Sequence, residues 1–278
     1  MRWRGQRESG NIEDRRGMSG GGMAIGGIGG LIVAAIIYFL GGDPSQVVPA
    51  PSETQGQMQT DPADPNDTLR NYIGVVLAST EDAWTALFEK MNRQYVDPTL
   101  VLFTGQTQAG CGLASSASGP FYCPSDSKVY IDLGFFNELS SRFGASNGDF
   151  AMAYVLAHEV GHHVQHLLGL TDQVDRQRQN LSESGYNKLS VKLELQADFL
   201  AGVWAHYNRN NLDAGDIEEA LSAASAVGDD HLQKQSQGHV VPDAFTHGTS
   251  EQRMYWFKRG YTTGDINQGD TFSDPALN

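Results

Sequence analysis

The segment Ala157-His158-Glu159-Val160-Gly161-His162-His163 decides how the rest of the chain folds. It lies within residues 150–169, whose apolar positions recur at three- and four-residue steps and predict a helix with one buried face. On such a helix His158 and His162 are one turn apart, so both imidazoles can bind one metal ion, with Glu159 beside them as a base. The pattern H-E-x-x-H is typical of zinc hydrolases, although it also arises by chance in roughly one such chain in a hundred.

A third ligand is needed, because catalytic zinc usually takes three protein ligands and keeps a fourth position for water. Residues 191–206 predict a second helix, on which Glu194 and Asp198 are one turn apart and share a face. Facing the histidine helix, Glu194 would bind the zinc and Asp198 would accept the free ring N–H of His158. An acidic pair that only solvates a helix surface is the alternative. The mostly apolar neighbours of the pair favour the ligand role.

The chain has 278 residues, 40% of them hydrophobic, which suffices for one sizeable domain with appendages. Its formal net charge of −14 argues against nucleic acid as a partner, because phosphate binding needs clustered Lys and Arg. The charge is uneven, since residues 1–17 carry five arginines against three acidic residues. The net negative charge is therefore carried by residues 18–278.

An uncharged run with an apolar centre follows at residues 18–42 and is long enough to span a bilayer, which takes about twenty residues. By the positive-inside rule the basic residues 1–17 should stay in the cytoplasm and the C-terminal part should lie outside it. We therefore expect a single-pass signal anchor in the bacterial inner (plasma) membrane, with a periplasmic or extracellular catalytic domain. A cleaved signal peptide and a buried core helix are the alternatives.

Three glycines of this run, Gly22, Gly26 and Gly30, form two successive G-x-x-x-G steps. This pattern lets transmembrane helices approach closely and is compatible with a homodimer. In so glycine-rich a run it can equally be accidental, and the oligomeric state stays open.

Residues 43–67 hold five prolines among polar residues and predict a linker, because too little apolar surface is available to order them. The folded domain is expected at residues 68–278. The apolar patterns of this domain predict several helices, and they predict strands near residues 100–104 and 128–133. They indicate a mainly helical α+β domain with a small sheet. The strand Val129 to Leu133 precedes the histidine helix and is placed to pair with an extended peptide, or is an ordinary sheet strand.

The chain has two cysteines, Cys111 and Cys123, both in the part expected outside the cytoplasm. Two thiols so close in sequence are expected to form a disulfide in an oxidising compartment. The alternative, a pair of metal ligands, lacks nearby partners.

Several segments together resemble the bacterial neutral zinc metallopeptidase family of the YpfJ type. The segments that carry the resemblance are residues 1–17, Cys111-Gly112, 119–124, 129–132, 158–163, 194–198, 228–230 and 245–250. The resemblance covers almost the whole chain and implies a membrane-anchored, gluzincin-like protein with a zincin-like fold. That family is assigned as peptidases largely by its H-E-x-x-H motif rather than by known substrates.

Thr246-His247 with Arg253 is also similar to the T-H-P…R element of other membrane and periplasmic zinc peptidases. Here Gly248 replaces the proline of that element, which weakens the comparison.

The expected reaction is hydrolysis of peptide bonds in a peptide or protein substrate, by a zinc metalloendopeptidase with one Zn²⁺ per chain. Bound by His158, His162 and Glu194, the zinc would activate water and polarise the peptide carbonyl. Glu159 would take the proton of the water and pass it to the leaving amine.

The tetrahedral oxyanion needs a hydrogen-bond donor, and three residues are candidates for it. His247 is the first, with His231 and Tyr130 as alternatives. The remaining histidines are expected on the surface or in packing roles, because four-coordinate zinc leaves no position for them. They are His163, His166, His206 and His239.

The rival function is a membrane-tethered, zinc-containing binding or interaction protein without peptidase activity. Glu159 discriminates between the two, because a purely structural zinc site has no use for a base beside the metal. Its presence favours hydrolysis.

Overall fold

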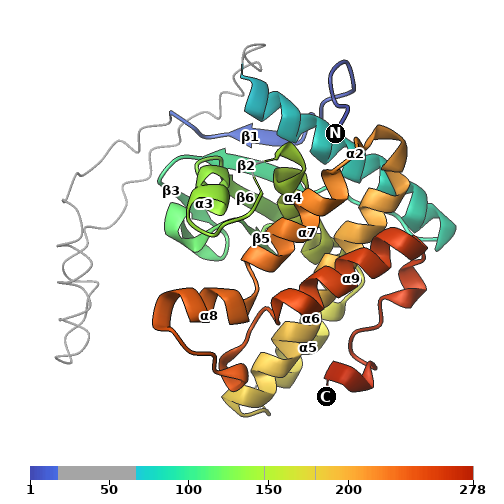
Figure 1. The fold of residues 1–278 in the computed structure, drawn as a ribbon. Coiled ribbons are helices and arrows are strands. Elements are labelled where there is room, and N and C mark those ends of the chain that lie inside the picture. The colour runs from blue at the N-terminus through green and yellow to red at the C-terminus, as the bar shows by residue number, and fades with distance from the viewer. Residues whose placement is uncertain (18–66, 147, 179, 278) are drawn as a thin grey trace, which may run out of the picture. The chain divides into compact units, whose positions relative to one another are not determined.

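The apolar periodicity around the two histidines forms a helix, α4 (Asp149–Leu167), and other helices make up most of the fold around it (Figure 1). The computed structural model describes residues 1–17, 67–146, 148–178 and 180–277. The other helices are α2 (Thr68–Lys90), α3 (Phe135–Ser141), α5 (Leu170–Arg178), α6 (Glu183–Tyr207), α7 (Asp216–Ala226), α8 (Asp229–Gln237) and α9 (Ser250–Thr263). Short 3-10 helices are η2 (Ser116–Ser118), η3 (Arg209–Asn211), η4 (Pro242–Ala244), η5 (Ile266–Gln268) and η6 (Pro275–Leu277).

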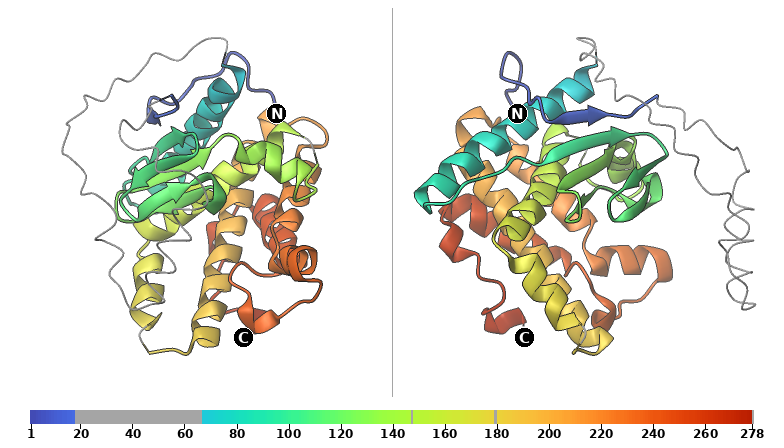
Figure 2. Two further views of the ribbon diagram at one scale, coloured as in Figure 1. Left: turned by 90° about the vertical axis from the view of Figure 1, so that its left-hand side faces the viewer. Right: turned by 180° about the vertical axis from the view of Figure 1, so that it is seen from behind.

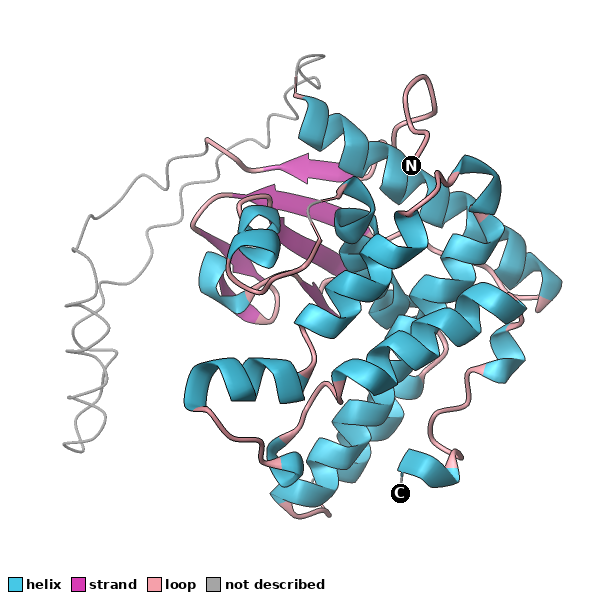
Figure 3. Ribbon diagram, in the orientation of Figure 1, coloured by secondary structure: helices cyan, strands magenta, loops and turns pink. Residues whose placement is uncertain are grey.

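A four-stranded sheet lies to one side of the helices, in the order β1-β2-β6-β5 (Figure 3). Its strands are β1 (Ile12–Asp14), β2 (Thr99–Phe103), β6 (Lys128–Asp132) and β5 (Phe121–Cys123). The first three strands run parallel, and β5 is antiparallel to β6. A separate hairpin pairs β3 (Gln106–Ala109) with β4 (Gly112–Ser115). The fold is therefore mainly helical α+β with small sheets, as predicted.

The strand at residues 129–133, predicted either to pair with an extended substrate or to be an ordinary sheet strand, is an ordinary sheet strand. It forms β6, which is hydrogen-bonded to β2 on one side and to β5 on the other. Both of its edges are therefore used within the sheet, and the open edge next to it belongs to β5. The sequence predicted a strand at this position but carried no information on its place in the sheet.

The N-terminal residues are part of the folded unit, whereas the sequence predicted a domain over 68–278 and a separate cytoplasmic segment over 1–17. Residues 1–16 and 62–278 form one compact unit. Strand β1 lies beside β2 at the edge of the sheet (Figure 2). The Met1 side chain is buried in the main core. The physical reason is burial and strand pairing, which stabilise this short basic segment against the domain.

The predicted anchor at 18–42 with its glycines Gly22, Gly26 and Gly30, and the linker up to residue 66, lie outside the described residues. Among the residues that the structure describes, no helix is both long enough and apolar enough to cross a membrane.

The predicted disulfide between Cys111 and Cys123 is present. Cys111 lies in the turn between β3 and β4, and Cys123 ends the edge strand β5. The bond therefore fastens the hairpin to the edge of the main sheet.

Helix α6 runs through the middle of the helical body and touches two neighbours through glycine. A Cβ added at Gly202 would lie 2.1 Å from the carbonyl oxygen of Phe257, and one at Gly260 would lie 2.0 Å from that of Phe199. On the other side of α6, a Cβ at Gly161 would lie 3.0 Å from the carbonyl oxygen of Ala197. The backbones of α6 and α9 are thus in direct contact, and α4 approaches α6 almost as closely.

We predict that Gly202→Ala or Gly260→Ala destabilises the protein strongly, because each added methyl group meets a backbone atom that cannot rotate away. Overpacking typically costs about 1–3 kcal/mol, and a clash with backbone should reach or exceed the upper end. Urea unfolding measures the loss. Gly10→Ala is the matched control, since nothing lies within 4 Å of its added Cβ. Equal stability of Gly202→Ala and Gly10→Ala would contradict the contact.

Candidate metal centre

Three side chains predicted as zinc ligands converge between α4 and α6. The Nε2 atom of His158 lies 3.2 Å from Nε2 of His162 and 3.2 Å from Oε2 of Glu194. His162 Nε2 lies 3.4 Å from the other oxygen of Glu194. One atom from each residue lies within 4.8 Å of the corresponding atoms of the other two, so a single ion between them could contact all three.

The second nitrogen of each histidine is held by a hydrogen bond. His158 Nδ1 lies 2.9 Å from Oδ1 of Asp198, and His162 Nδ1 lies 2.9 Å from Oε1 of Gln165. With each Nδ1–H donating to these oxygens, the Nε2 lone pairs face the shared point, as metal ligation requires. Asp198 therefore contacts the histidine that the sequence predicted for it.

Asp198 is fully buried and is held by three further donors. Arg253 from α9 donates to both carboxylate oxygens, at 2.8 and 2.9 Å, and Tyr154 from α4 donates to Oδ1 at 2.5 Å. Burial alone would raise the pKa of Asp198, but the charges of Arg253 and His158 lower it to about 2. The carboxylate thus stays ionised and keeps the ring of His158 in place.

The centre favours positive charge. Burial would raise the pKa of Glu194, yet the imidazoles of His162 and His247 hold it well below its ordinary value. Burial lowers the pKa of His158, but Asp198 and Glu194 raise it to about 10. Two nitrogen donors and one carboxylate, converging in a pocket that stabilises a cation, fit the ligand set of catalytic zinc.

Glu159 lies beside the ligands and is buried, with 7% of its surface exposed. Its carboxylate takes part in none of the hydrogen bonds or ion pairs found across the described parts of the chain, unlike Glu194 and Asp198. It is therefore free to exchange a proton with a bound molecule.

His247 is held at the mouth of the centre by Asp229. One oxygen of Asp229 accepts hydrogen bonds from the backbone N–H groups of Thr246, His247 and Gly248, at 2.8, 2.6 and 2.9 Å. The charge of Glu194 and the hydrogen bond to Asp229 raise the pKa of His247 against the effect of its burial. The imidazole remains about half exposed, so it can meet a substrate.

The two alternatives to His247 lie elsewhere. Tyr130 donates to Asp126 at 2.7 Å and stacks on Phe121, in a small core separate from the main one. His231 lines a cavity whose other lining residues include none of the proposed zinc ligands. Of the three residues, His247 alone is electrostatically coupled to Glu194.

The other histidines have the packing and surface roles expected of them. His163 is buried and contacts Tyr122 and the carbonyl of Val96, while His166 bonds the same tyrosine. His206 bonds the backbone of Tyr261, and His239 is exposed.

A second acidic cluster, formed by Asp149, Asp216 and Glu219, lies around the amino group of Met1. The Met1 nitrogen is 3.1 Å from Asp216 and 3.4 Å from Asp149. The ammonium group therefore already provides a cation for this cluster.

Sequence reasoning missed four supporting residues, namely Tyr154, Gln165, Asp229 and Arg253. Two of them had a usable signal. Gln165 follows His162 by three residues and therefore shares its helix face, and Arg253 belongs to the T-H…R element. Neither Tyr154 nor Asp229 carried such a signal. Their roles come from contacts between segments distant in sequence.

We predict that Arg253→Met lowers the free energy of unfolding by roughly 3–5 kcal/mol, because it leaves the carboxylate of Asp198 buried without its countercharge. Urea unfolding at a fixed zinc concentration measures the effect. Lys258→Met changes an exposed cation on the same helix and should stay within about 0.5 kcal/mol of the parent. Equal effects of the two substitutions would contradict the assigned role of Arg253.

We predict that stability falls as the pH drops from about 6.5 toward 4, in part through His163. Burial lowers its pKa to about 4, against the hydrogen bond to Val96. In the unfolded chain the imidazole of His163 has a pKa near 6.5, so it binds a proton at a higher pH than in the folded protein. Its contribution to the free energy of unfolding is therefore complete above pH 6.5 and falls by roughly 3 kcal/mol on approach to pH 4. Unfolding titrations of the parent and His163→Gln should differ in slope over this range, whereas His239→Gln should follow the parent.

Comparison with known proteins agrees with this centre. A family model described as "Putative neutral zinc metallopeptidase" matches residues 1–272. The chain is 50% identical over 285 residues to "Uncharacterized protein YpfJ" of Escherichia coli K12, covering 98% of this chain and 99% of that protein. It is 43% identical over 218 residues to "Uncharacterized protein Mb2605" of Mycobacterium bovis, covering 74% and 73%. No solved structure matches. The chain therefore belongs to this neutral zinc metallopeptidase family.

Proposed function

We propose that this protein is a zinc-dependent metalloendopeptidase with one zinc ion per chain, bound by His158, His162 and Glu194. The observation that supports it most is the convergence of these three side chains within 4.8 Å, together with the hydrogen bonds that orient both imidazoles. Bound in this way, zinc would polarise the scissile carbonyl and make water more acidic. The zincin-like architecture and the gluzincin-like ligand set are part of the same proposal.

The chain supplies the proton transfers and the oxyanion contact. Glu159, buried and without another partner among the described residues, accepts the proton of the attacking water and delivers it to the leaving amine. His247, kept in position by Asp229, donates a hydrogen bond to the oxyanion. Its raised pKa favours the protonated form that such a donor needs.

We propose that an extended peptide lies along β5 rather than along β6. β5 is the last strand in the order of the sheet, and hydrogen bonds between the Tyr122 hydroxyl and the imidazoles of His163 and His166 join it to α4. A peptide paired with this edge would therefore run beside the helix that carries His158 and His162.

The disulfide supports a location of this domain outside the cytoplasm, because such bonds persist in oxidising compartments. Attachment to the membrane through residues 18–42 remains a proposal from the sequence.

We predict that Glu159→Gln lowers peptide cleavage by at least ~10²–10⁴-fold while the zinc content stays near one per chain, because the shape is kept and only the base is lost. Cleavage of a diverse peptide library, read by mass spectrometry, and metal analysis of the same sample measure the two effects. Glu183→Gln, an exposed change at the start of α6, is the matched control and should retain full activity.

Three results would contradict this proposal in different ways. Parent-like cleavage by Glu159→Gln would remove the assigned base. Full zinc retention in a His158→Ala, His162→Ala double variant would show that the zinc binds at another site. Zinc bound without any cleavage by the parent protein would favour the rival binding function.

A further inference from the structure

The N-terminal arm, residues 1–16, is built into the fold along much of its length. Its strand β1 pairs with β2, and the backbone N–H groups of Leu100 and Arg15 donate to Asn11 and Leu102 at 2.8 Å each. Ser9 is buried and its N–H donates to the carbonyl of Gly74 on α2 at 3.0 Å. The arm therefore completes the edge of the sheet that β2 would otherwise expose.

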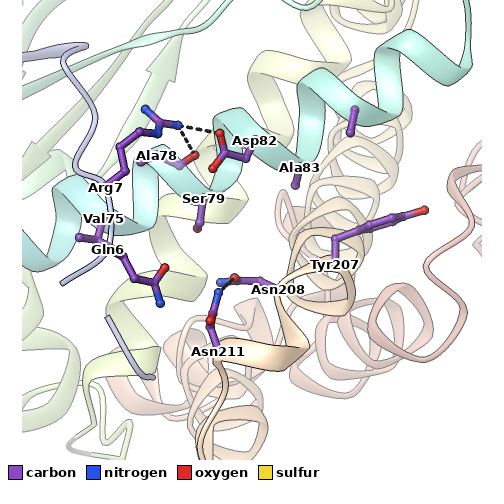
Figure 4. Close-up of a pocket in the computed structure, with 11 residues that line it drawn as sticks. Gln6, Arg7, Val75, Ala78, Ser79, Asp82, Ala83, Tyr207, Asn208 and Asn211 are labelled. Atoms are coloured by element: carbon purple, nitrogen blue, oxygen red, sulfur yellow. Dashed lines mark hydrogen bonds and ion pairs between the residues drawn. The ribbon is translucent and has the colours of Figure 1, made fainter. Parts of the chain in front are cut away.

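Three of the five arginines of the arm, Arg2, Arg7 and Arg16, form ion pairs with the domain in the described structure. Arg7 contacts two residues of α2, Glu81 at 3.0 Å and Asp82 at 2.8 Å, and Figure 4 shows the contact with Asp82. In the opposite direction, Lys128 of β6 contacts Glu13 of the arm at 2.7 Å. Arm and α2 together form walls of a cavity of about 320 Å³, which includes none of the proposed zinc ligands. These charges of the arm are paired with opposite charges of the domain, so they need no lipid headgroup as a partner.

The two ends of the segment missing from the described chain meet at one place. Arg16, at the end of the arm, lies 2.6 Å from Asp67, which caps the start of α2. Close by, Arg70 of α2 reaches back to Glu8 of the arm at 2.7 Å. The described chain therefore breaks off after residue 17 and resumes at residue 67 beside this same point.

We infer that the N-terminal arm and residues 67–277 lie on the same side of any membrane that the chain meets, so residues 18–42 do not connect them by a single crossing. A single span would separate its ends by the hydrocarbon core, which is about 30 Å thick, whereas the ion pairs between arm and domain need contact. The positive-inside rule also does not apply to arm arginines that are paired with the domain, because it describes basic residues that remain in the cytoplasm. The inference does not depend on peptidase activity.

Labelling of single cysteines in the full-length chain tests the sidedness. Gly10→Cys places a thiol on the exposed arm without changing its charges, and Leu113→Cys places one on the domain at a side chain that is 64% exposed. The two native cysteines are paired and should not react. A membrane-impermeant maleimide, applied to intact cells, spheroplasts and permeabilised cells, should label both positions in the same preparations. Labelling of one position with protection of the other in spheroplasts would overturn the inference.

Crosslinking tests the contact itself. In membranes that contain the full chain, a short bismaleimide should join the thiols of an Arg16→Cys, Asp67→Cys double variant, because the two side chains are in contact and partly exposed. Joining is read after proteolysis as a linked peptide pair by mass spectrometry. Each single variant is the control and should give no linked pair. A double variant with no more linked peptide than the single variants would also overturn the inference, even if zinc binding and cleavage were intact.

Discussion

Direct backbone contact between helices is the constraint on which the metal centre depends. Helices usually pack with their axes 8–10 Å apart, a distance set by the side chains between them. Here Gly202, Gly260 and Gly161 place no side chain between the helices. Gly161 is one of the two x positions of the H-E-x-x-H pattern. Short histidine and carboxylate side chains can share one ion only when their helices come this close. The same contacts bring α9, with Arg253, against Asp198.

The parts of the site that the sequence predicts are those encoded within one helix. His158 and His162, and Glu194 with Asp198, are each separated by one turn, so periodicity alone gives their common face. The start of α9 is similarly local, since the side chain of Thr249 accepts from the backbone of Gln252, as a capping residue should. The disulfide follows from two cysteines twelve positions apart. None of these inferences required knowledge of which helices touch.

The parts that sequence reasoning did not find depend on pairing between distant segments. Strand β1 is three residues long and reads Ile-Glu-Asp, which carries no strand periodicity, and its partner β2 begins at Thr99. The position of β6 inside the sheet depends on its pairing with β2 and β5. Gly248 illustrates a different limit: its φ of 89° is a left-handed conformation that proline cannot adopt. Proline could therefore not replace Gly248 without a change in this backbone path.

The order of the contributing helices along the chain also governs when the centre can exist during synthesis. Arg253 follows His162 by about 90 residues, which a ribosome takes roughly 5–20 s to add. Until Arg253 is added, Asp198 has no guanidinium beside it, and α6 lacks the helix that packs against Gly202. The nascent protein therefore carries both histidines long before it can hold them in their final arrangement. The metal centre gains its full set of supporting contacts only when most of the chain has been made.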